Sequence, residues 1–306
     1  MKGTELKIWK ALANAISGQD TDLAEFREED VLRVANEHGV GPLLDSQIHT
    51  GMKYGLSSEA REKLNESSRN QAAHDLLLNR STSKTLALLA ENNIDVLLLK
   101  GTALAHLYYE ETFHRPRCDS DLYIREEAIE ETASLLADHG YQITGLGNRH
   151  YSSKQFGAHT VLFQNIGMSF DIHWKLSNRI LFQDVLPFED CYKEHQGIPD
   201  LGPRASTPSS DDLLLHACIH RIAHGRNTER NRLIWLYDIH LLWNAMNDEE
   251  KEDFVDKALN KKIGALCADA LEISEELFTP VGASLARDQD YLIKLNSNAK
   301  NEPSSN

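Results

Sequence analysis

Strand-forming sequence occupies only the middle of this 306-residue chain, and helix-forming sequence lies on both sides of it. β-Branched and alternating segments cluster between residues 94 and 174, whereas apolar residues recur at helical spacing before and after this stretch. The hydrophobic fraction of 41% is sufficient for a substantial core. The sequence therefore predicts an α+β fold with helices at both ends.

Changes in composition predict the domain organisation. A segment rich in Pro, Gly and Ser, residues 194–212, separates the strand-rich part from the C-terminal helices. We expect an N-terminal helical segment at 1–93, an α/β core at 94–195, a C-terminal helical domain at 205–295 and a disordered tail at 296–306.

Local signals predict individual elements. A long helical stretch opens with a Ser57 or Ser58 cap and stops at Asn92 and Asn93, ahead of a short buried strand. Residues 165–167 predict a hairpin loop, and the apolar spacing of 251–277 predicts one helix.

Two aspartates, Asp119 and Asp121, lie in a short extended segment. Alternation places both on one face, about 6.5 to 7 Å apart, with Ser120 and Leu122 on the other face. Magnesium prefers oxygen ligands and is often shared between carboxylates and substrate phosphates, so the pair suggests phosphoryl chemistry. An isolated DxD triplet also fits a solvated strand end or a turn.

A strand-to-helix turn precedes the aspartates at Lys100, Gly101 and Thr102. Backbone donors and a helix N-terminus meet at such a turn and can bind an anion. Lys100 is either a phosphate ligand or the polar end of a buried strand.

A third carboxylate, Asp171, lies on a later strand-like segment. Phe170 and Ile172 alternate there with Asp171 and His173, which predicts that Asp171 lies on the polar face. His173 is either a phosphate contact or a solvated or hydrogen-bonded histidine.

Net charge limits the partners. The formal charge is −15, and nucleic-acid affinity comes largely from Lys and Arg that neutralise phosphates, so a long nucleic acid is disfavoured. The four cysteines contain no CxxC pair, and no run reaches the 18 or so apolar residues of a membrane span. The sequence predicts a cytoplasmic protein with reduced thiols and no membrane partner.

Three segments carry a family resemblance: "LLLKGTALAHLYY", "RPRCDSDLYI" and "SFDIHWKL". Together they resemble the uncharacterised nucleotidyltransferase family of the DNA polymerase beta superfamily. The resemblance implies a small mixed sheet with the DxD on one strand, the third aspartate on a neighbouring strand, and a helical bundle over the nucleotide.

The resemblance also implies roles for single residues. Asp119, Asp121 and Asp171 would be catalytic and would hold two Mg²⁺ ions, or Mn²⁺ in their place. Lys100 and Gly101 match the phosphate-side turn, and Arg115 matches the arginine that precedes the DxD. Two positions depart from the usual pattern: Thr102 replaces a second Gly or a Ser, and Ser120 replaces an apolar residue.

Three histidines, His216, His220 and His224, share one face of a predicted helix. A straight row does not converge on one ion, and no HExxH motif is present. The row is a metal site, a nucleotide contact (His220 and His224 in particular) or a structural feature.

The expected activity is transfer of a nucleoside monophosphate from a nucleoside triphosphate, with ATP favoured, to a hydroxyl of a small molecule or protein. Pyrophosphate would be released. The alternatives are a non-catalytic nucleotide-binding or interaction subunit on the same fold, and nucleotide addition to RNA, which the charge disfavours.

Overall fold

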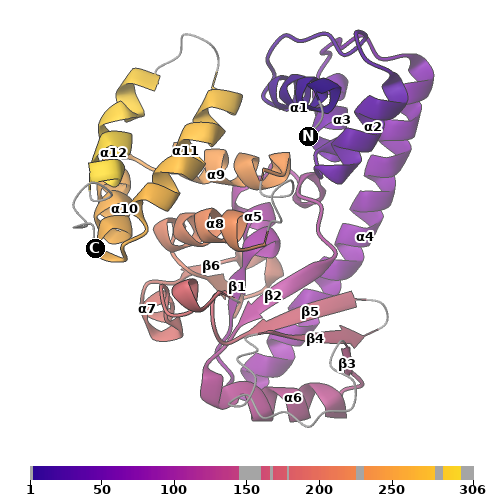
Figure 1. Ribbon diagram of the computed structural model, residues 1–306. Coiled ribbons are helices and arrows are strands. Elements are labelled where there is room, and N and C mark those ends of the chain that lie inside the picture. The colour runs from indigo at the N-terminus through magenta and orange to yellow at the C-terminus, as the bar shows by residue number, and fades with distance from the viewer. Residues whose placement is uncertain are drawn as a thin grey trace. The chain divides into compact units, whose positions relative to one another are not determined.

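The chain forms two compact units, each assembled from separate stretches of sequence. The computed structural model describes residues 3–144, 160–165, 168–177, 179–224, 231–279 and 285–297 (Figure 1). The helical unit comprises Met1–Gln71, Phe113–Pro116 and Ala217–Asn306. The sheet unit comprises Ala72–Thr112 and Arg117–His216.

The sheet unit is built on a five-stranded mixed sheet (Figure 1). Its strands are β1 (Leu97–Leu99), β2 (Asp119–Tyr123), β3 (Gln142–Thr144), β4 (Thr160–Asn165) and β5 (Met168–His173). Their order is β1-β2-β5-β4-β3, with β2 and β5 parallel and the other pairs antiparallel. The predicted α+β class is confirmed.

One face of this sheet packs against helix α4 (Ser58–Glu91), whose residues from 72 onward belong to the sheet unit. Leu122, Phe170 and Ile172 are buried there. Thr85 Oγ1 and the Tyr141 hydroxyl are hydrogen-bonded at 2.7 Å on the same side. Side-chain alternation therefore directs the aspartates of β2 and β5 to the opposite face.

The outer edge of β1 is covered by a small two-stranded sheet, β6 (Gln196–Gly197) and β7 (Ser206–Thr207). Ser206 Oγ donates to the Val96 carbonyl at 3.2 Å, and Thr207 Oγ1 donates to the Leu98 carbonyl at 2.8 Å. These hydroxyls satisfy strand carbonyls that would otherwise face outward.

Short helices complete the sheet unit. They are α5 (Lys100–Tyr108), α6 (Ile129–Asp138), α7 (Phe188–Lys193), the 3-10 segments η1 (Thr112–His114), η2 (Glu126–Ala128), η3 (Ile180–Phe182) and η4 (Pro199–Leu201), and the first half of α8 (Ser210–His224). The last two residues of η1, Phe113 and His114, belong to the helical unit.

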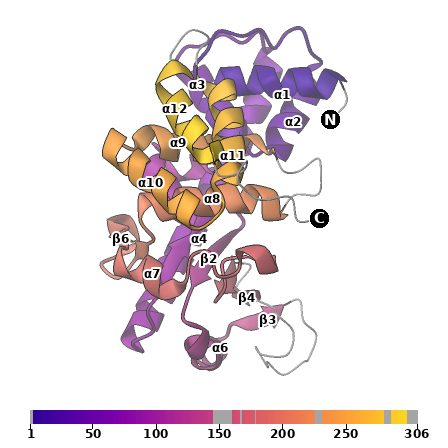
Figure 2. The same cartoon turned by 60° about the vertical axis from the view of Figure 1, so that its left-hand side comes forward.

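The helical unit takes its helices from both ends of the chain. They are α1 (Gly3–Ile16), α2 (Glu28–Glu37), α3 (Gly41–His49), α9 (Leu233–Ala245), α10 (Asp248–Asn260), α11 (Gly264–Phe278) and α12 (Leu285–Ser297), with parts of α4 and α8. Figure 2 shows α10, α11 and α12 packed together, and α11 also contacts α1 and α9. Trp9 Nε1 donates to the Asn231 carbonyl at 3.1 Å, so the first helix is tied to sequence more than two hundred residues away.

Most local predictions agree with the structure. The Ser57 hydroxyl accepts the Ala60 N–H at 3.2 Å and caps α4. Asn93 ends that stretch with φ 58°, in the left-handed region that asparagine tolerates. Asn165 pairs with Met168 across the predicted hairpin, whose residues 166 and 167 lie outside the described residues.

The prediction of one helix over 251–277 is wrong. The chain forms α10 and α11, separated at Lys261, Lys262 and Ile263. Lys262 adopts φ 59°, which no α-helix accommodates. Gly264 begins α11 where an added Cβ would lie 2.6 Å from the Leu295 carbonyl oxygen, so the break lets α11 approach α12 closely.

A disordered tail was predicted at 296–306. Its first two residues, Asn296 and Ser297, belong to α12, and residues 298–306 lie outside the described residues. Within the described part of the chain, no helix has the length and apolar character needed to cross a bilayer.

Candidate metal and nucleotide site

Asp121 and Asp171 occupy the same register position on neighbouring parallel strands, so their side chains share one face of the sheet. On the other side of β2, Leu99 of β1 pairs with Asp121, and the next residue is Lys100. Strand pairing thus brings the two carboxylates together, and Lys100 directly follows the residue that pairs with Asp121. Asp121 of the DxD and the third aspartate lie on neighbouring strands, whereas the roles assigned to these residues stay predictions.

Lys100 is the first residue of α5, and its backbone has φ 51°. A residue other than glycine adopts this left-handed conformation at a cost of about 1 kcal/mol or more. In this conformation its Nζ donates to Asp121 Oδ1 at 2.5 Å. The turn therefore directs the lysine to the carboxylate face of the sheet.

His173 approaches the same carboxylate. Its Nε2 lies 2.8 Å from Asp121 Oδ1 and 3.5 Å from Lys100 Nζ, and its side chain is only 3% exposed. Because an ionised carboxylate only accepts hydrogen bonds, Nε2 carries the hydrogen in this contact. Coordination of a metal through Nε2 would require the other tautomer.

The electrostatic environment shifts the pKa values of the two aspartates in opposite directions. Burial alone would raise the pKa of Asp121, but the Lys100 ammonium and the hydrogen bond from His173 outweigh it and hold that pKa well below its usual range. Burial, together with the negative charge of Asp121, raises the pKa of Asp171. Asp121 is thus a fixed anion, and Asp171 is the more basic carboxylate.

A divalent cation fits this donor set. Asp121, Asp171 and His173 offer ligand atoms that all lie within 4.8 Å of one another. Two carboxylates in adjoining positions repel each other, and this repulsion adds to the effect of burial in raising the pKa of Asp171. Two oxygen donors suit Mg²⁺ or Mn²⁺, and the imidazole adds a donor that Mn²⁺ accepts more readily.

Asp119, the first aspartate of the DxD, is half-buried at the start of β2 and pairs in register with Ser169. It shares the face of Asp121 but is not among the three clustered residues. Its assignment as a metal ligand stays a prediction.

Thr102 and Gly101 are both buried in the first turn of α5. The Thr102 hydroxyl donates to Ser120 Oγ at 3.0 Å, and Ser120 lies on the face of β2 opposite the aspartates. The Thr102 side chain therefore contacts the back of the DxD strand. The two departures from the family pattern, Thr102 and Ser120, are partners of each other.

Arg115 forms a buried ion pair within the helical unit. Its Nε donates to Asp238 Oδ1 at 2.8 Å and its Nη2 donates to Asp238 Oδ2 at 2.8 Å, with the side chains 9% and 4% exposed. The fork-shaped guanidinium matches the carboxylate in this bidentate arrangement. A role for Arg115 in nucleotide binding stays a prediction, and the geometry shows its pairing with α9.

Arg117, the second arginine before the DxD, forms a buried ion pair within the sheet unit. Its Nη1 lies 2.6 Å from Asp75 Oδ1, and its guanidinium also donates to Asn79 and to the Thr112 carbonyl. Both side chains of the ion pair are almost fully buried, at 3% and 2% exposed. This pair ties α4 to the chain two residues before Asp119.

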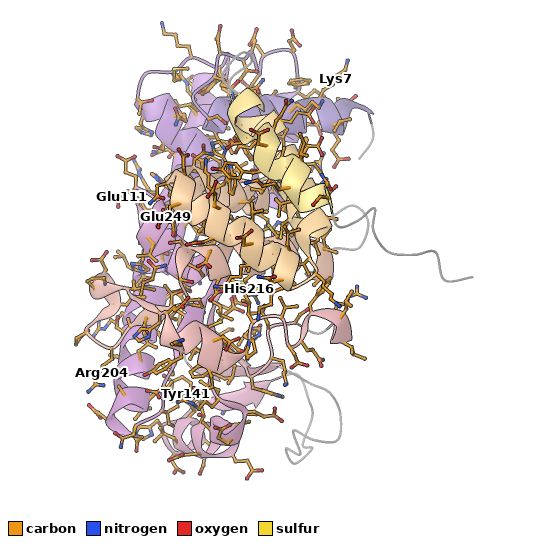
Figure 3. The ribbon with its side chains drawn as sticks, turned by 90° about the vertical axis from the view of Figure 1, so that its left-hand side faces the viewer. Lys7, Glu111, Tyr141, Arg204, His216 and Glu249 are labelled. Atoms are coloured by element: carbon orange, nitrogen blue, oxygen red, sulfur yellow. The ribbon has the colours of Figure 1, made fainter. Side chains whose placement is uncertain are left out.

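The histidine row divides along α8. His216, labelled in Figure 3, is buried, and His220 is half-buried with its ring 4.7 Å from that of Trp235 in the helical unit. The edge-to-face geometry is that of a packing contact. His224 ends α8, and its side chain lies outside the described residues. The nucleotide contacts predicted for His220 and His224 stay predictions.

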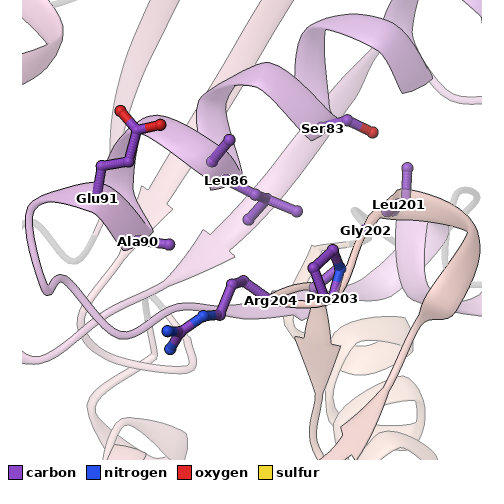
Figure 4. A pocket seen from close by; sticks show the side chains of 10 residues that line it. Ser83, Leu86, Ala90, Glu91, Leu201, Gly202, Pro203 and Arg204 are labelled. Carbon is purple, nitrogen blue, oxygen red and sulfur yellow. The ribbon is translucent and has the colours of Figure 1, made fainter.

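A separate pocket of about 490 Å³ lies in the sheet unit between the C-terminal half of α4 and residues 201–205 (Figure 4). Leu86 and Ala90 belong to its apolar wall, and Glu91 and Arg204 lie toward one end. None of the predicted site residues lines it.

A small mixed sheet with carboxylates at one register position of neighbouring strands defines the nucleotidyltransferase class of folds that the resemblance implied. The chain belongs to the family described as uncharacterised nucleotidyltransferases, whose family model matches residues 24–279. No curated protein matches the chain.

Proposed function

We propose that this chain is a Mg²⁺-dependent nucleotidyltransferase that moves a nucleoside monophosphate from a nucleoside triphosphate to an acceptor hydroxyl and releases pyrophosphate. The supporting observation is the opposed pair Asp121 and Asp171 on parallel strands, with His173 in the same cluster. Membership in the family supports this reaction class. ATP is the first donor to test, and small molecules and proteins are the acceptor classes.

The metal would be held by Asp121 and Asp171, with Asp119 as the further carboxylate of a two-metal site, and would neutralise charge on the triphosphate. Lys100 and the backbone N–H groups at the start of α5 support binding of the phosphates. These groups act by position and charge, which is most of what this chemistry requires from a protein.

The bond changes in the proposed reaction balance without a further co-reactant. The acceptor oxygen forms a bond to the α-phosphorus, and the bond from the α-phosphorus to the oxygen that bridges to the β-phosphate breaks. Pyrophosphate leaves with that electron pair, and the hydroxyl proton passes to Asp171. Asp171 is assigned this role because its carboxylate belongs to the same cluster as Asp121 and His173.

The experiment is incubation with each α-labelled nucleoside triphosphate, Mg²⁺ and cell extract, followed by mass analysis of whatever gains a nucleotide. Label transfer that Asp121→Asn abolishes is the expected result. Absence of triphosphate binding with Mg²⁺ present, or transfer that survives Asp121→Asn, would refute the proposal.

The second candidate is a non-catalytic nucleotide-binding or interaction subunit. Its support is that two side chains of the implied nucleotide set have partners inside the fold, Arg115 with Asp238 and Thr102 with Ser120. It predicts triphosphate binding without pyrophosphate release. Nucleotide addition to RNA is disfavoured by the net charge of −15, and salt-sensitive RNA binding in a gel-shift titration would revive it.

A further inference from the structure

Lys100 forms its ion pair with the carboxylate that would also bind the metal. Its Nζ lies 2.5 Å from Asp121 Oδ1, and His173 Nε2 lies 2.8 Å from the same oxygen. Magnesium binds carboxylate oxygens at about 2.0 to 2.1 Å. An ammonium group and a divalent cation bound to the same carboxylate would repel each other strongly, so the two contacts compete.

The charges of the cluster also favour replacement of the Lys100 ammonium by a metal. Asp121 and Asp171 bring two negative charges to one register position, and the Lys100 ammonium, at 15% side-chain exposure, compensates one of them. A divalent cation would compensate both. Arrival of the metal therefore removes the electrostatic reason for the ammonium to stay at Asp121.

We propose that Lys100 is a mobile internal counterion, which holds Asp121 while the metal is absent and transfers to the triphosphate when metal and nucleotide bind. This inference rests on the proposed function and adds a coupling role for one of its residues. Lys100 would disfavour binding of the metal alone and favour binding of metal and nucleotide together.

The position of Lys100 at the start of α5 gives its ammonium a second possible partner, the bound phosphates. The residue begins α5, so its side chain starts beside the helix N-terminus, where the phosphates would bind. A lysine stem of four methylene groups rotates freely, and a change of rotamers is enough to redirect its ammonium. The left-handed backbone at φ 51° aims that stem toward the carboxylate face in the described state.

A binding cycle tests the coupling. Calorimetry on the full chain measures the affinity for Mn²⁺ alone in the wild type, in Lys100→Met and in Lys175→Met. Lys175 is a matched control, because it is in the same unit and pairs with Asp184 at 2.8 Å, away from the two aspartates. Removal of the Lys100 ammonium is expected to tighten Mn²⁺ binding at least about tenfold relative to the control.

With a non-hydrolysable triphosphate present, this advantage is expected to shrink or reverse, because the variant lacks the ammonium that would join the phosphates. By linkage, the same variant should show a smaller gain in nucleotide affinity on addition of Mn²⁺. If Lys100→Met binds Mn²⁺ no more tightly than Lys175→Met, the counterion role is wrong.

A measurement on the wild type covers the case in which Lys100→Met fails to fold. Acetylation of Lys100 by an amine reagent, followed by peptide mass analysis, reports whether its amine is held. Low reactivity is expected without metal, higher reactivity with Mn²⁺ alone, and low reactivity again with Mn²⁺ and the non-hydrolysable triphosphate. Reactivity that Mn²⁺ leaves unchanged or lowers would overturn the proposal.

Asp121→Asn separates this inference from the proposed function. Mn²⁺ binding that depends on Asp121, combined with unchanged Lys100 reactivity, defeats the counterion role alone. Mn²⁺-dependent release of Lys100 without any nucleotide transfer defeats the proposed reaction alone. Absence of Mn²⁺ binding in the wild type and in Lys100→Met defeats both.

Discussion

The hydroxyls of Thr82 and Ser120 are hydrogen-bonded at 2.8 Å between α4 and β2. Thr102 donates to the same Ser120 oxygen at 3.0 Å, and all three side chains are buried. Ser120 separates Asp119 from Asp121, so this cluster fixes the DxD strand from behind, while the aspartates extend from the other face.

Ser120→Ala should therefore destabilise the protein. The substitution removes a buried hydroxyl and leaves two threonine hydroxyls with one partner fewer, at a cost of about 1 to 3 kcal/mol. Urea denaturation measures this change. The variant with Thr82→Val and Thr102→Val added should recover part of the loss, because no buried hydroxyl of the cluster then lacks its partner. Equal stability of Ser120→Ala and wild type would contradict the prediction.

Asp171→Asn should separate binding from turnover. The isosteric change opens no cavity, and Asp121 would still hold the metal with its nucleotide, so we expect the fold and much of the triphosphate affinity to persist. Turnover should fall by a factor on the order of 10² or more, as for a group that acts in the transition state. Parallel loss of thermal stability and binding would mark Asp171 as structural, and unchanged turnover would remove it from the reaction.

Arg115 and Asp238 should behave as a structural pair. Asp238→Asn leaves a buried guanidinium without its counterion, and loss of one partner of a buried pair costs about 3 to 5 kcal/mol. The double variant Arg115→Met with Asp238→Leu should recover much of that loss in a thermal melt. Triphosphate affinity decides the alternative: an Arg115→Lys variant that melts like wild type but binds the nucleotide weakly would assign Arg115 to the phosphates.

His38 should make stability depend on pH. Its Nδ1 accepts the Leu233 N–H at 3.2 Å, and burial, with the charge of Arg232, lowers the pKa of His38 to about 4. The folded pKa is below the unfolded value of about 6.5, so the unfolded chain binds more protons between those values. The contribution of His38 to the free energy of unfolding should be constant above pH 6.5. It should decrease as the pH falls from 6.5 toward 4.

His38→Asn keeps an acceptor near Nδ1 but cannot be protonated, so it should remove about one proton from the pH dependence of unfolding near pH 5. His49→Asn is the control, because His49 is in the same unit and its side chain is 63% exposed. Denaturant titrations between pH 8 and pH 5 measure both. An equal decline in the two variants would show that His38 is not responsible.

The carboxylate site was predictable because it depends on strand periodicity. Alternation placed Asp121 and Asp171 on polar faces, and their register pairing on β2 and β5 agrees. The ionic contact of Lys100 was not predictable, because it depends on one left-handed residue at a turn, and a lysine gives no sequence signal for that conformation.

The partners of the two arginines before the DxD were equally hidden. Arg115 pairs with Asp238, 123 positions later, and Arg117 pairs with Asp75 on α4. Such pairs are set by tertiary packing, whereas local spacing reports only which residues share a face. The separation of α10 from α11 at Lys262 has the same origin, since the close approach of Gly264 to Leu295 is a contact between distant segments.

The helical unit, with Trp9 bonded to Asn231 and Gln19 Nε2 donating to the Phe278 carbonyl at 3.1 Å, has a consequence for synthesis. A ribosome makes the N-terminal helices first, at roughly 5 to 20 residues per second, so α1 waits at least about ten seconds before α9 and α11 emerge. During that interval the apolar side of α1, with Trp9 and Leu12, has α2 and α3 as packing partners but lacks α11. The apolar side of α1 is therefore covered completely only after α11 has been made.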